Sequence, residues 1–537
     1  MIEPQQILTV LNFGRVDAES DTRFENCFIG TDMLRHVMKP QHSLVLGSKG
    51  SGKSAAFRLL CTDKEKLRAL FPKQYTDIFC IPVYGFFNEE YVYGNEFREL
   101  RSDSIDDFRY FWLMIVGLKS VTAIAEEPKV REIVAKSKSS KLKEAYKIVL
   151  QVIDDLELSA GKSSVGKLKQ RVMQLVKPSA KESQISNEAI SKVLTGDFKH
   201  KTGMSVTAVL DQIDIVLQET NCMAWMMLDK LDLLFIDDFE KLKSSITGLV
   251  QLLIEQVNRF KNIHFKIFLR SDIFRQLRIV NKSHLVSYTS EMKWNESLLL
   301  KLLVSRAVAD PTVREYCEQQ IDEEISISDV INGTDEDVLK LFYIIFESTM
   351  GPDDNSDDDF PFTHTWMLRS LTDGMGNVYP REQIHLGNLA VEKQIEINKK
   401  EGGEHQSARV ISARALKEAF ASLSIYRCDT YLYSEFPHLS KHFDVFRGSS
   451  KTKFTRQELN KLFEKFTPNE DEGIRAVYDT GLLRPIGMTV DSSMEFTIPL
   501  LYQIGLGMTQ KSNGNHSPSD TQNINQSGTP THPADEN

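Results

Sequence analysis

The stretch SLVLGSKGSGKSAAFRLL, residues 43–60, decides how this chain is expected to fold. It begins with a short apolar run, Ser43–Leu46, of the kind that forms a buried strand. The glycine-rich octapeptide Gly47–Ser54 follows, and AAFRLL then begins a helical pattern. Glycines permit positive φ angles and let the backbone approach a ligand closely. We therefore expect a strand, a tight glycine loop and a helix in immediate succession.

The octapeptide fits the pattern G-x-x-x-x-G-K-S/T, the phosphate-binding P-loop. Its backbone N–H groups would cradle phosphate oxygens, and the start of the next helix is itself an anion site. The Lys53 ammonium would reach the β- and γ-phosphates, and the Ser54 hydroxyl would bind Mg²⁺. A chance turn is disfavoured by the strand before the loop and the helix after it. The residues predicted to bind the phosphates are Gly47, Ser48, Lys49, Gly50, Ser51, Gly52, Lys53, Ser54 and Ala55.

The composition is that of a soluble globular protein. The chain has 537 residues, of which 41% are hydrophobic and 26% charged. Apolar runs such as Phe111–Leu118 are much shorter than the roughly 18 residues that span a bilayer. The start of the chain does not have the pattern of a signal peptide. The six cysteines form no C-x-x-C pair, which argues against a zinc site or a disulfide framework. We expect a cytoplasmic protein with no membrane segment.

Charge is distributed unevenly along the chain. The net charge is −10, which argues against a general nucleic-acid coat protein. Residues 129–201 nevertheless hold 16 Lys and Arg against 8 Asp and Glu. This basic stretch is either a solvated helical face or a surface for the phosphates of DNA or RNA. An acidic run, DDNSDDD, occupies residues 353–359.

Buried strands are expected at five places, separated by helical patterns as β-α-β connections require. The strands are 43–47, 78–84, 223–229, 264–270 and, more weakly, 286–290. The segment between the second and third strands is too long for one crossover connection, and its sequence pattern predicts several helices. We expect an N-terminal adenine-side segment (1–42), an NTPase core (43–107 and 221–292), a basic helical insertion (108–220), a helical lid (293–405), a winged-helix-like domain (406–508) and a disordered tail (509–537).

The third strand carries a second nucleotide signal. CMAWMMLDKLDLLF, residues 222–235, is an apolar run that ends in Asp229. A carboxylate at a strand tip holds Mg²⁺ in Walker B motifs. The alternative is a buried strand that ends in an acidic turn residue. Many ATPases place a glutamate directly after this aspartate as the base that polarises water, whereas here the position is Lys230. Asp232 is the next candidate base, or else a helix-capping acid.

The fourth strand ends in Arg270-Ser271-Asp272. If this strand lies between those that carry the P-loop and Asp229, its tip is close to the γ-phosphate. Arg270 would then sense the phosphate and stabilise transition-state charge. The alternative is a structural salt bridge between Arg270 and a nearby acid. We expect Lys53, Asp229, Asp232 and Arg270 to be the catalytic group.

FGRVDAESD (13–21), CFIGTDMLRHV (27–37), GSKGSGKSA, MMLDKLDLLF and KIFLRSD together give the chain a family likeness. It resembles bacterial P-loop ATPases related to the STAND, KAP and origin-recognition (AAA+-like) groups, which often occur in mobile or phage-defence islands. The likeness covers about residues 10–300 and is specific at the two Walker motifs. It implies an ASCE/AAA+-like α/β fold with a parallel sheet, and ATP as the nucleotide.

Two weaker parts of the likeness concern the base and the lid. CFIGTDML resembles the segment that packs around adenine, with Thr31 where an Arg is usual, and it implies a base contact at Phe28. DGMGNVYPREQIHLGNLA, residues 373–390, resembles a sensor region of the lid. It implies a base contact by Pro380 and a phosphate contact by Arg381. The alternative is a helix that begins at a proline and carries a surface arginine.

The sequence therefore predicts a Mg²⁺-dependent ATPase that acts as a slow nucleotide switch. The second hypothesis is a nucleotide-gated scaffold or nucleic-acid sensor with negligible turnover, which Lys230 favours. The expected partners are ATP, DNA or RNA at the basic insertion or the winged-helix-like domain, and a second copy or a defence-system protein. A P-loop kinase is disfavoured by the long lid and the C-terminal module.

Overall fold

The computed structural model describes two compact units, which we treat separately. Unit 1 comprises residues 1–372 and 376–423, and unit 2 comprises residues 373–375 and 424–537. The described residues are 2–16, 21, 32–62, 78–85, 104–156, 198–235, 238–280, 282–351, 360–402, 405, 407–467, 469 and 471–508. The acidic run 353–359 and the C-terminal tail lie outside these ranges, and so does Phe28.

Unit 1 is built on a five-stranded parallel sheet with the strand order β2-β3-β4-β1-β5. β4 therefore lies between the strand that precedes the glycine loop and the strand that precedes Asp229. In register, Leu46 of β1 pairs with Leu269, and Leu228 of β3 pairs with Ile267. The strands are β1 (Leu44–Gly47), β2 (Ile78–Tyr84), β3 (Met223–Leu228), β4 (Ile263–Arg270) and β5 (Thr289–Glu291).

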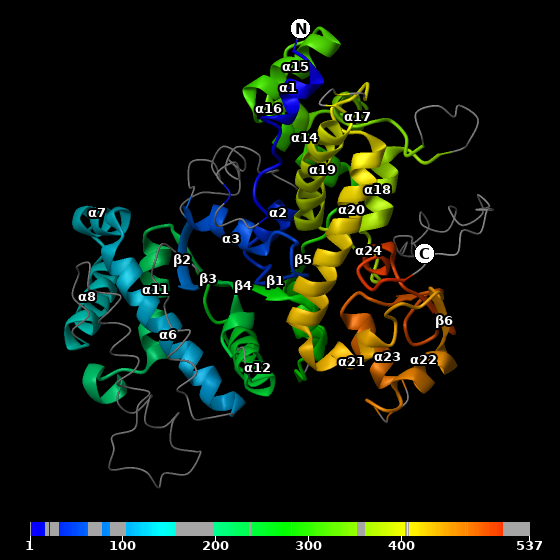
Figure 1. Ribbon diagram of the computed structural model, residues 1–537. Coiled ribbons are helices and arrows are strands. Elements are labelled where there is room, and N and C mark those ends of the chain that lie inside the picture. Colours follow the sequence, from blue (N-terminus) through cyan, green and yellow to red (C-terminus); the bar gives the residue numbers. More distant parts are fainter. Residues whose placement is uncertain are drawn as a thin grey trace, which may run out of the picture. The chain divides into compact units, whose positions relative to one another are not determined.

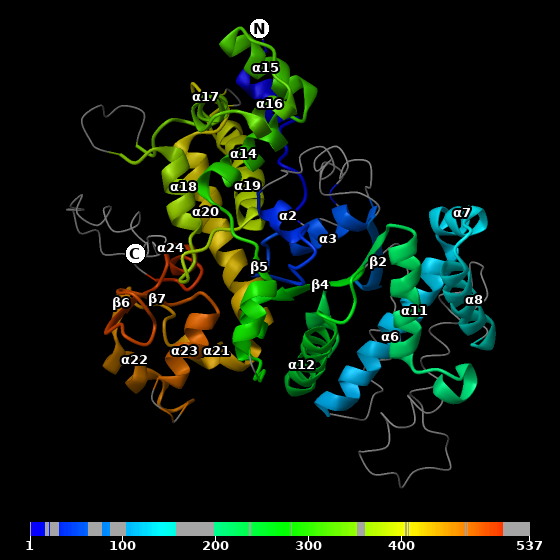
Figure 2. The same ribbon diagram turned by 180° about the vertical axis from the view of Figure 1, so that it is seen from behind.

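Helices cover both faces of this sheet (Figures 1 and 2). Because side chains alternate along a strand, Ala224, Met226 and Leu228 enter one apolar cluster while Trp225 and Met227 enter the other. The first cluster is closed by α6 (Ile105–Glu126), α11 (Val206–Glu219) and α12 (Phe239–Gln256). The second is closed by α2 (Asp32–Val37) and α3 (Lys53–Thr62). Strands buried on both faces explain the continuous apolar runs in the sequence.

Four strands lie where the sequence predicts them, but the fifth differs. The 3₁₀ helix η2 (Lys282–Tyr288) occupies most of the predicted strand 286–290, and β5 begins only at Thr289. Val286 is 76% exposed, so the apolar residue that suggested a strand is not part of the core. β5 is a short edge strand, and such strands carry a weak sequence signal.

Helix α6 is the one described helix with the length and apolar composition to cross a membrane. The sequence analysis therefore underestimated the length of the apolar segment in this region. However, 72% of its apolar window is buried inside the protein. α6 packs against α12, α11 and β2, and the indole Nε1 of Trp112 donates to the Ser245 carbonyl at 3.1 Å. This is the environment of a core helix of a globular unit.

The region between β2 and β3 is helical in its described parts, as the sequence predicts. Besides α6 and α11 it contains α7 (Pro128–Lys136) and α8 (Ser140–Asp155). α8 packs on both α6 and α11, so these helices and one face of the sheet share a single apolar core.

The side chain of Lys266, a residue of β4, is fully buried on the face of the sheet that α2 covers. Its Nζ donates to the carbonyls of Val37, Lys39 and His42 at 2.6–2.8 Å and lies 4.4 Å from the Trp225 ring centroid. Helix α2 ends at Val37, and the last carbonyls of a helix have no partner within the helix. The buried ammonium supplies that partner and joins the chain before the glycine loop to the sheet.

A group of helices follows β5 in the chain, and its first members fall within the region 293–405 that the sequence assigns to a lid. α14 packs against α16, α17 and α19, and α18 packs against α19. The short α1 (Pro4–Leu8) lies against α15 and α19. The helices are α14 (Glu296–Ala307), α15 (Pro311–Ile321), α16 (Ile327–Asn332), α17 (Asp335–Ile345), α18 (Thr363–Leu371), α19 (Pro380–Lys400) and α20 (Ala413–Arg427).

The N-terminal segment is bound to these helices by its backbone. Asn388 of α19 accepts from the Phe13 N–H and donates to the Gly14 carbonyl, both at 2.9 Å. Arg306 of α14 donates to the Phe13 carbonyl at 2.9 Å and forms a buried ion pair with Asp21 at 2.6 Å. The FGRVDAESD motif is thus attached to the helical group at its beginning and at its end.

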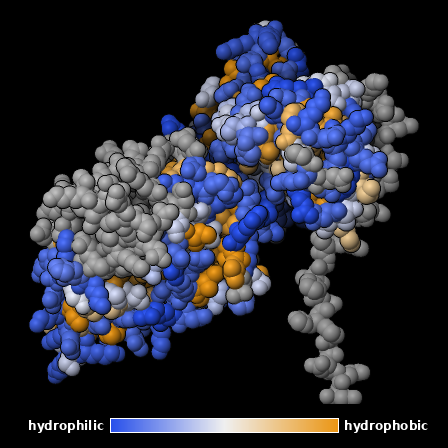
Figure 3. Space-filling model, turned by 90° about the horizontal axis from the view of Figure 1, so that it is seen from below, coloured by the Kyte–Doolittle hydropathy of each residue, from blue (hydrophilic) through white to orange (hydrophobic). Residues whose placement is uncertain are grey.

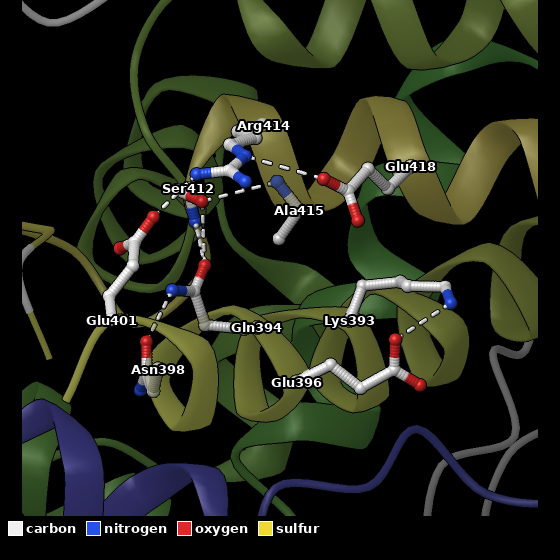
Figure 4. A network of polar contacts seen from close by, with 9 residues as sticks. All are labelled: Lys393, Gln394, Glu396, Asn398, Glu401, Ser412, Arg414, Ala415 and Glu418. Atoms are coloured by element: carbon white, nitrogen blue, oxygen red, sulfur yellow. Dashed lines mark hydrogen bonds and ion pairs between the residues drawn. The ribbon is translucent and has the colours of Figure 1, made fainter. Parts of the chain in front are cut away.

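Polar contacts join the end of α19 to the start of α20 (Figure 4). The Gln394 Oε1 accepts from the Ser412 N–H and hydroxyl at 2.9 and 2.6 Å, and its Nε2 donates to Asn398 at 2.9 Å. Arg414 pairs with Glu401 at 2.5 Å and with Glu418 at 3.3 Å. Gln394 is buried and both the oxygen and the nitrogen of its amide are hydrogen-bonded, which specifies how the two helices meet.

Unit 2 is a small helical module with a three-stranded antiparallel sheet of order β6-β8-β7. The central strand β8 is short, because Pro499 soon after it is the N-cap of a helix that takes up the following LLYQ. The elements are η3 (Cys428–Tyr433), η4 (Pro437–Leu439), α21 (Ser440–Asp444), β6 (Lys453–Thr455), α22 (Arg456–Phe463), α23 (Glu472–Asp479), β7 (Arg484–Pro485), β8 (Glu495–Thr497) and α24 (Leu500–Gln503).

The buried Arg306–Asp21 pair generates a stability prediction. Arg306→Met leaves the Asp21 carboxylate buried without its cation, which costs about 3 kcal/mol. The double variant Asp21→Asn/Arg306→Met should lose less than the sum of the two single losses. Urea denaturation followed by circular dichroism measures all four proteins. Strictly additive losses would show that the pair is not energetically coupled.

Candidate nucleotide-binding site

The glycine loop connects β1 directly to α3 at the carboxyl edge of the sheet (Figure 1). Gly50 and Gly52 have φ angles of +89° and +92°, which L side chains rarely adopt. A Cβ on Gly47 would lie 2.4 Å from the Ser51 hydroxyl oxygen. The three motif glycines are therefore required by the backbone path and by packing. Gly47–Ala55 together form the strand–loop–helix unit that the sequence predicts.

The Lys53 ammonium lies inside this loop. Its Nζ donates to the carbonyls of Gly47 and Ser48, each at 2.8 Å. Burial lowers the pKa of Lys53 to about 8, although the nearby Asp229 charge acts in the opposite direction. The group remains mostly protonated at neutral pH. A half-buried cation held within such a loop is suited to binding an anion.

Asp229 reaches the loop from β3, on the far side of β4. Its carboxylate accepts a hydrogen bond from the Ser54 hydroxyl, and its own N–H donates to the Tyr84 carbonyl at 2.9 Å. Burial raises the pKa of Asp229 to about 6, against the effect of the Ser54 hydrogen bond. The structure thus brings together Ser54 and Asp229, the two residues that the sequence assigns to the metal.

These two oxygen donors fit Mg²⁺. This cation prefers hard oxygens and is usually held by one or two protein ligands, with phosphate and water oxygens in its other positions. Within the described ranges no group of three or more His, Cys, Asp or Glu side chains is placed to hold a metal. A site that is completed by a triphosphate is therefore compatible with the donors present, whereas an all-protein metal cage is not found among them.

Asp232 and Arg270 also lie at this edge. Arg270 ends β4, and its Nη1 is 3.4 Å from the Asp232 carboxylate on the 3₁₀ helix η1 (Leu231–Leu233). The Arg270 Nε and Nη2 donate to Asp272 at 3.2 and 2.8 Å. Arg270 is therefore paired with two acids, as the salt-bridge alternative requires. Its position at the strand tip next to the loop is also the one that the sensor hypothesis requires.

Lys230, between Asp229 and Asp232, has a left-handed backbone with φ +55°. Such a conformation is uncommon for a residue with a long side chain. It turns the chain sharply after β3, so that η1 begins at once. The turn is what places Asp232 within reach of Arg270.

The lid residues predicted at the site lie at the first turn of α19. Pro380 is the first residue of this helix and is buried. A Cβ built on Gly50 would lie 3.2 Å from the Cβ of Arg381 and 3.6 Å from that of Tyr379. The helix start therefore touches the glycine loop. The phosphate contact of Arg381 and the base contact of Pro380 remain predictions.

Sequence reasoning missed two residues that contact this machinery. Asp272 pairs with Arg270, and the local signal for this contact is an acid two residues after an arginine. Trp294 follows β5, and its Nε1 donates to the Ser51 carbonyl at 2.8 Å. Nothing in the local sequence connects Trp294 with the glycine loop, because the contact depends on β5 lying next to β1.

The comparisons with known proteins leave the family open. No protein-family model matches this chain, and no curated protein matches its sequence. The family likeness and the assignment of a nucleotide to the site therefore stand as proposals, which the geometry above supports.

The raised pKa of Asp229 predicts a stability gain on its removal. The native carboxyl holds its proton up to about pH 6, whereas an unfolded aspartate releases it near pH 3.8. Stability is therefore lost as the pH rises through this window. Without nucleotide or Mg²⁺, Asp229→Asn should be more stable than the wild type by up to about 3 kcal/mol at pH 7.5, and by less than about 1 kcal/mol at pH 4.

The matched control for this prediction is Asp272→Asn. Burial acts to raise the pKa of Asp272, but the charge and hydrogen bonds of Arg270 outweigh it and leave the pKa lowered. Its carboxylate therefore stabilises the fold at neutral pH, so the Asn variant should be less stable at pH 7.5. Urea denaturation in EDTA measures both variants. A loss of stability in Asp229→Asn at pH 7.5 would contradict the inferred cost of burying this charge.

Proposed function

We propose that this protein is a P-loop ATPase that binds ATP with Mg²⁺ and acts as a nucleotide-driven switch. The observation that carries the proposal is the hydrogen bond between the Ser54 hydroxyl and the Asp229 carboxylate, with the Lys53 ammonium beside them. A phosphate-binding loop and a strand-tip carboxylate that meet at one point are the two halves of a metal–triphosphate site.

The strand order supports an ASCE/AAA+-like core. β4 separates the strand of the glycine loop from the strand of Asp229 and ends in Arg270. An arginine at that tip is positioned to stabilise the negative charge that develops on a phosphoryl group during its transfer. In unit 2, the order β6, α22, α23, β7, β8 with β8 in the middle supports a winged-helix-like module.

Each residue at the edge then has a role. Lys53 and the loop amides bind the phosphates, and Ser54 and Asp229 would hold Mg²⁺, which would neutralise phosphate charge. Asp232 orients the attacking water and accepts its proton. Arg270, held by Asp272 on one side, exchanges its weaker contact with Asp232 for a phosphate oxygen. Arg381 approaches the phosphates from the lid.

A route for the switch follows from chain connectivity. α19 begins at the glycine loop, and α20 runs as one helix from unit 1 into unit 2. The segment Asp373–Met375 belongs to unit 2, where the Gly374 N–H donates to the Gly481 carbonyl at 2.6 Å. The chain leaves this segment and reaches the loop at Arg381. A change at the nucleotide would therefore act on unit 2 through covalent connections.

Lys53→Ala tests the assignment directly. Removing the buried ammonium should lower ATP turnover at least tenfold and weaken ATP binding. Phosphate release measures the first and isothermal titration the second. Lys39→Ala is the control, because Lys39 has an exposed side chain in the same unit. Full turnover in the Lys53→Ala protein would overturn the proposal.

The second candidate is a nucleotide-gated scaffold or nucleic-acid sensor with negligible hydrolysis. Lys230 stands where a catalytic glutamate is usual, and Asp232 is already paired with Arg270. A carboxylate engaged with a guanidinium is not free to orient a water molecule until that contact is released. Binding without turnover would follow if the contact persisted in the ATP-bound state.

Asp232→Asn separates the two candidates. If Asp232 is the base, turnover should fall at least tenfold while ATP affinity changes less than threefold, because the residue acts on water rather than on the phosphates. If the protein is a scaffold, wild type and variant should both show background phosphate release with unchanged affinity. Single-turnover assays with and without DNA measure the difference.

The proposed macromolecular partners are DNA or RNA, a second copy of the chain, or a defence-system protein, in the cytoplasm. α7, α8 and the turn between them expose Arg131, Lys138, Lys143 and Lys147, which suits sequence-independent phosphate contacts. The loop between β7 and β8 instead exposes Ile486, Met488 and Met494, at 43%, 96% and 63%, which suits a protein contact. Figure 3 shows a face on which hydrophobic residues gather among hydrophilic ones.

A further inference from the structure

We propose that Trp294 is a positioning residue that orients a phosphate-binding amide of the glycine loop. The inference rests on the proposed function and adds to it a residue outside every nucleotide motif. Trp294 lies three residues after β5, in a segment that packs along one side of the loop.

Two contacts place this segment against the loop. The Met292 N–H donates to the Leu46 carbonyl at 2.7 Å, which continues the pairing of β5 with β1. A Cβ built on Gly52 would lie 3.8 Å from both the Met292 Cε and the Trp294 Cζ2. The indole is half-buried, and its ring therefore borders the loop at Gly52.

The hydrogen bond from Trp294 acts on one peptide group. Its Nε1 donates to the Ser51 carbonyl at 2.8 Å. The carbonyl of Ser51 and the N–H of Gly52 belong to the same planar trans peptide, in which they point in opposite directions. Holding the carbonyl toward the indole therefore turns the Gly52 N–H to the opposite side, away from β5.

Gly52, like Gly50, is a loop residue for which such a restraint matters. It has φ +92° and no side chain, so its backbone has several accessible orientations. The amide must nevertheless be fixed before a phosphate arrives, because ordering it during binding would reduce affinity. Lys53 holds the opposite end of the loop through the carbonyls of Gly47 and Ser48. Trp294 supplies the corresponding restraint at Ser51.

Trp294→Phe tests the role, since phenylalanine keeps a ring beside Gly52 but has no N–H. Affinity for Mg²⁺–ADP, measured by isothermal titration, should fall about fivefold, as expected for one lost hydrogen bond. The unfolding temperature without nucleotide should match that of Trp366→Phe. Trp366 is also half-buried and packs on Phe420 of α20, so it is the matched control.

The emission of Trp294 in the Trp366→Phe protein keeps the test decisive even if Trp294→Phe folds poorly, because an emission unchanged by Mg²⁺–ADP would itself contradict the role of Trp294. Trp366→Phe retains Trp294, and its tryptophan emission should change on addition of Mg²⁺–ADP. Trp294→Phe should lose that change. If the wild type binds no nucleotide, the proposed function fails. If it binds and Trp294→Phe has the affinity and emission response of Trp366→Phe, only the role of Trp294 is overturned.

Discussion

The parallel alignment of β1, β4 and β3 is the constraint on which this site depends, because it brings the Ser54 hydroxyl to the Asp229 carboxylate. The two residues are far apart in the chain and meet because β1, β4 and β3 are parallel and end at one edge of the sheet. The apolar faces that bury these strands set their register, and the register sets which side chains meet. The helices between β2 and β3 add to the core without disturbing that edge, since they pack on one face of the sheet.

Two of the charges at this edge, those of Lys53 and Asp229, are held at a cost to stability, as expected for the proposed binding site. Lys53 and Arg270 stand against Asp229, Asp232 and Asp272, so the group has an excess of one negative charge when all are ionised. Burial lowers the pKa of Lys53 and raises that of Asp229, and each shift reports that a charge is held there at a cost. A bound cation would offset the cost of the Asp229 charge, and a bound polyphosphate would offset that of the Lys53 charge. Binding sites commonly reduce the stability of the unliganded protein in this way.

The site is also where the parts of the chain meet. The N-terminal segment is attached to α14 and α19 by Arg306 and Asn388, and α19 begins against the glycine loop. Trp294 joins the same loop from β5, and Lys266 connects the preceding helix to β4. The loop is thus supported from the sheet, from the start of α19 and from the edge strand. A ligand that orders the loop would therefore also restrict the motion of each of these elements.

The sequence by itself determined the strand–loop–helix unit, four of the five strands and the acid at the tip of the third. These features are local: a glycine pattern with forced φ angles, apolar runs buried on both faces, and a carboxylate directly after one of them. Only the tertiary structure decided the strand order, the pairing of Arg270 with both Asp232 and Asp272, and the contact of Trp294 with Ser51. Each of these depends on which strands become neighbours, and non-local packing of the whole unit decides that, whereas local sequence does not.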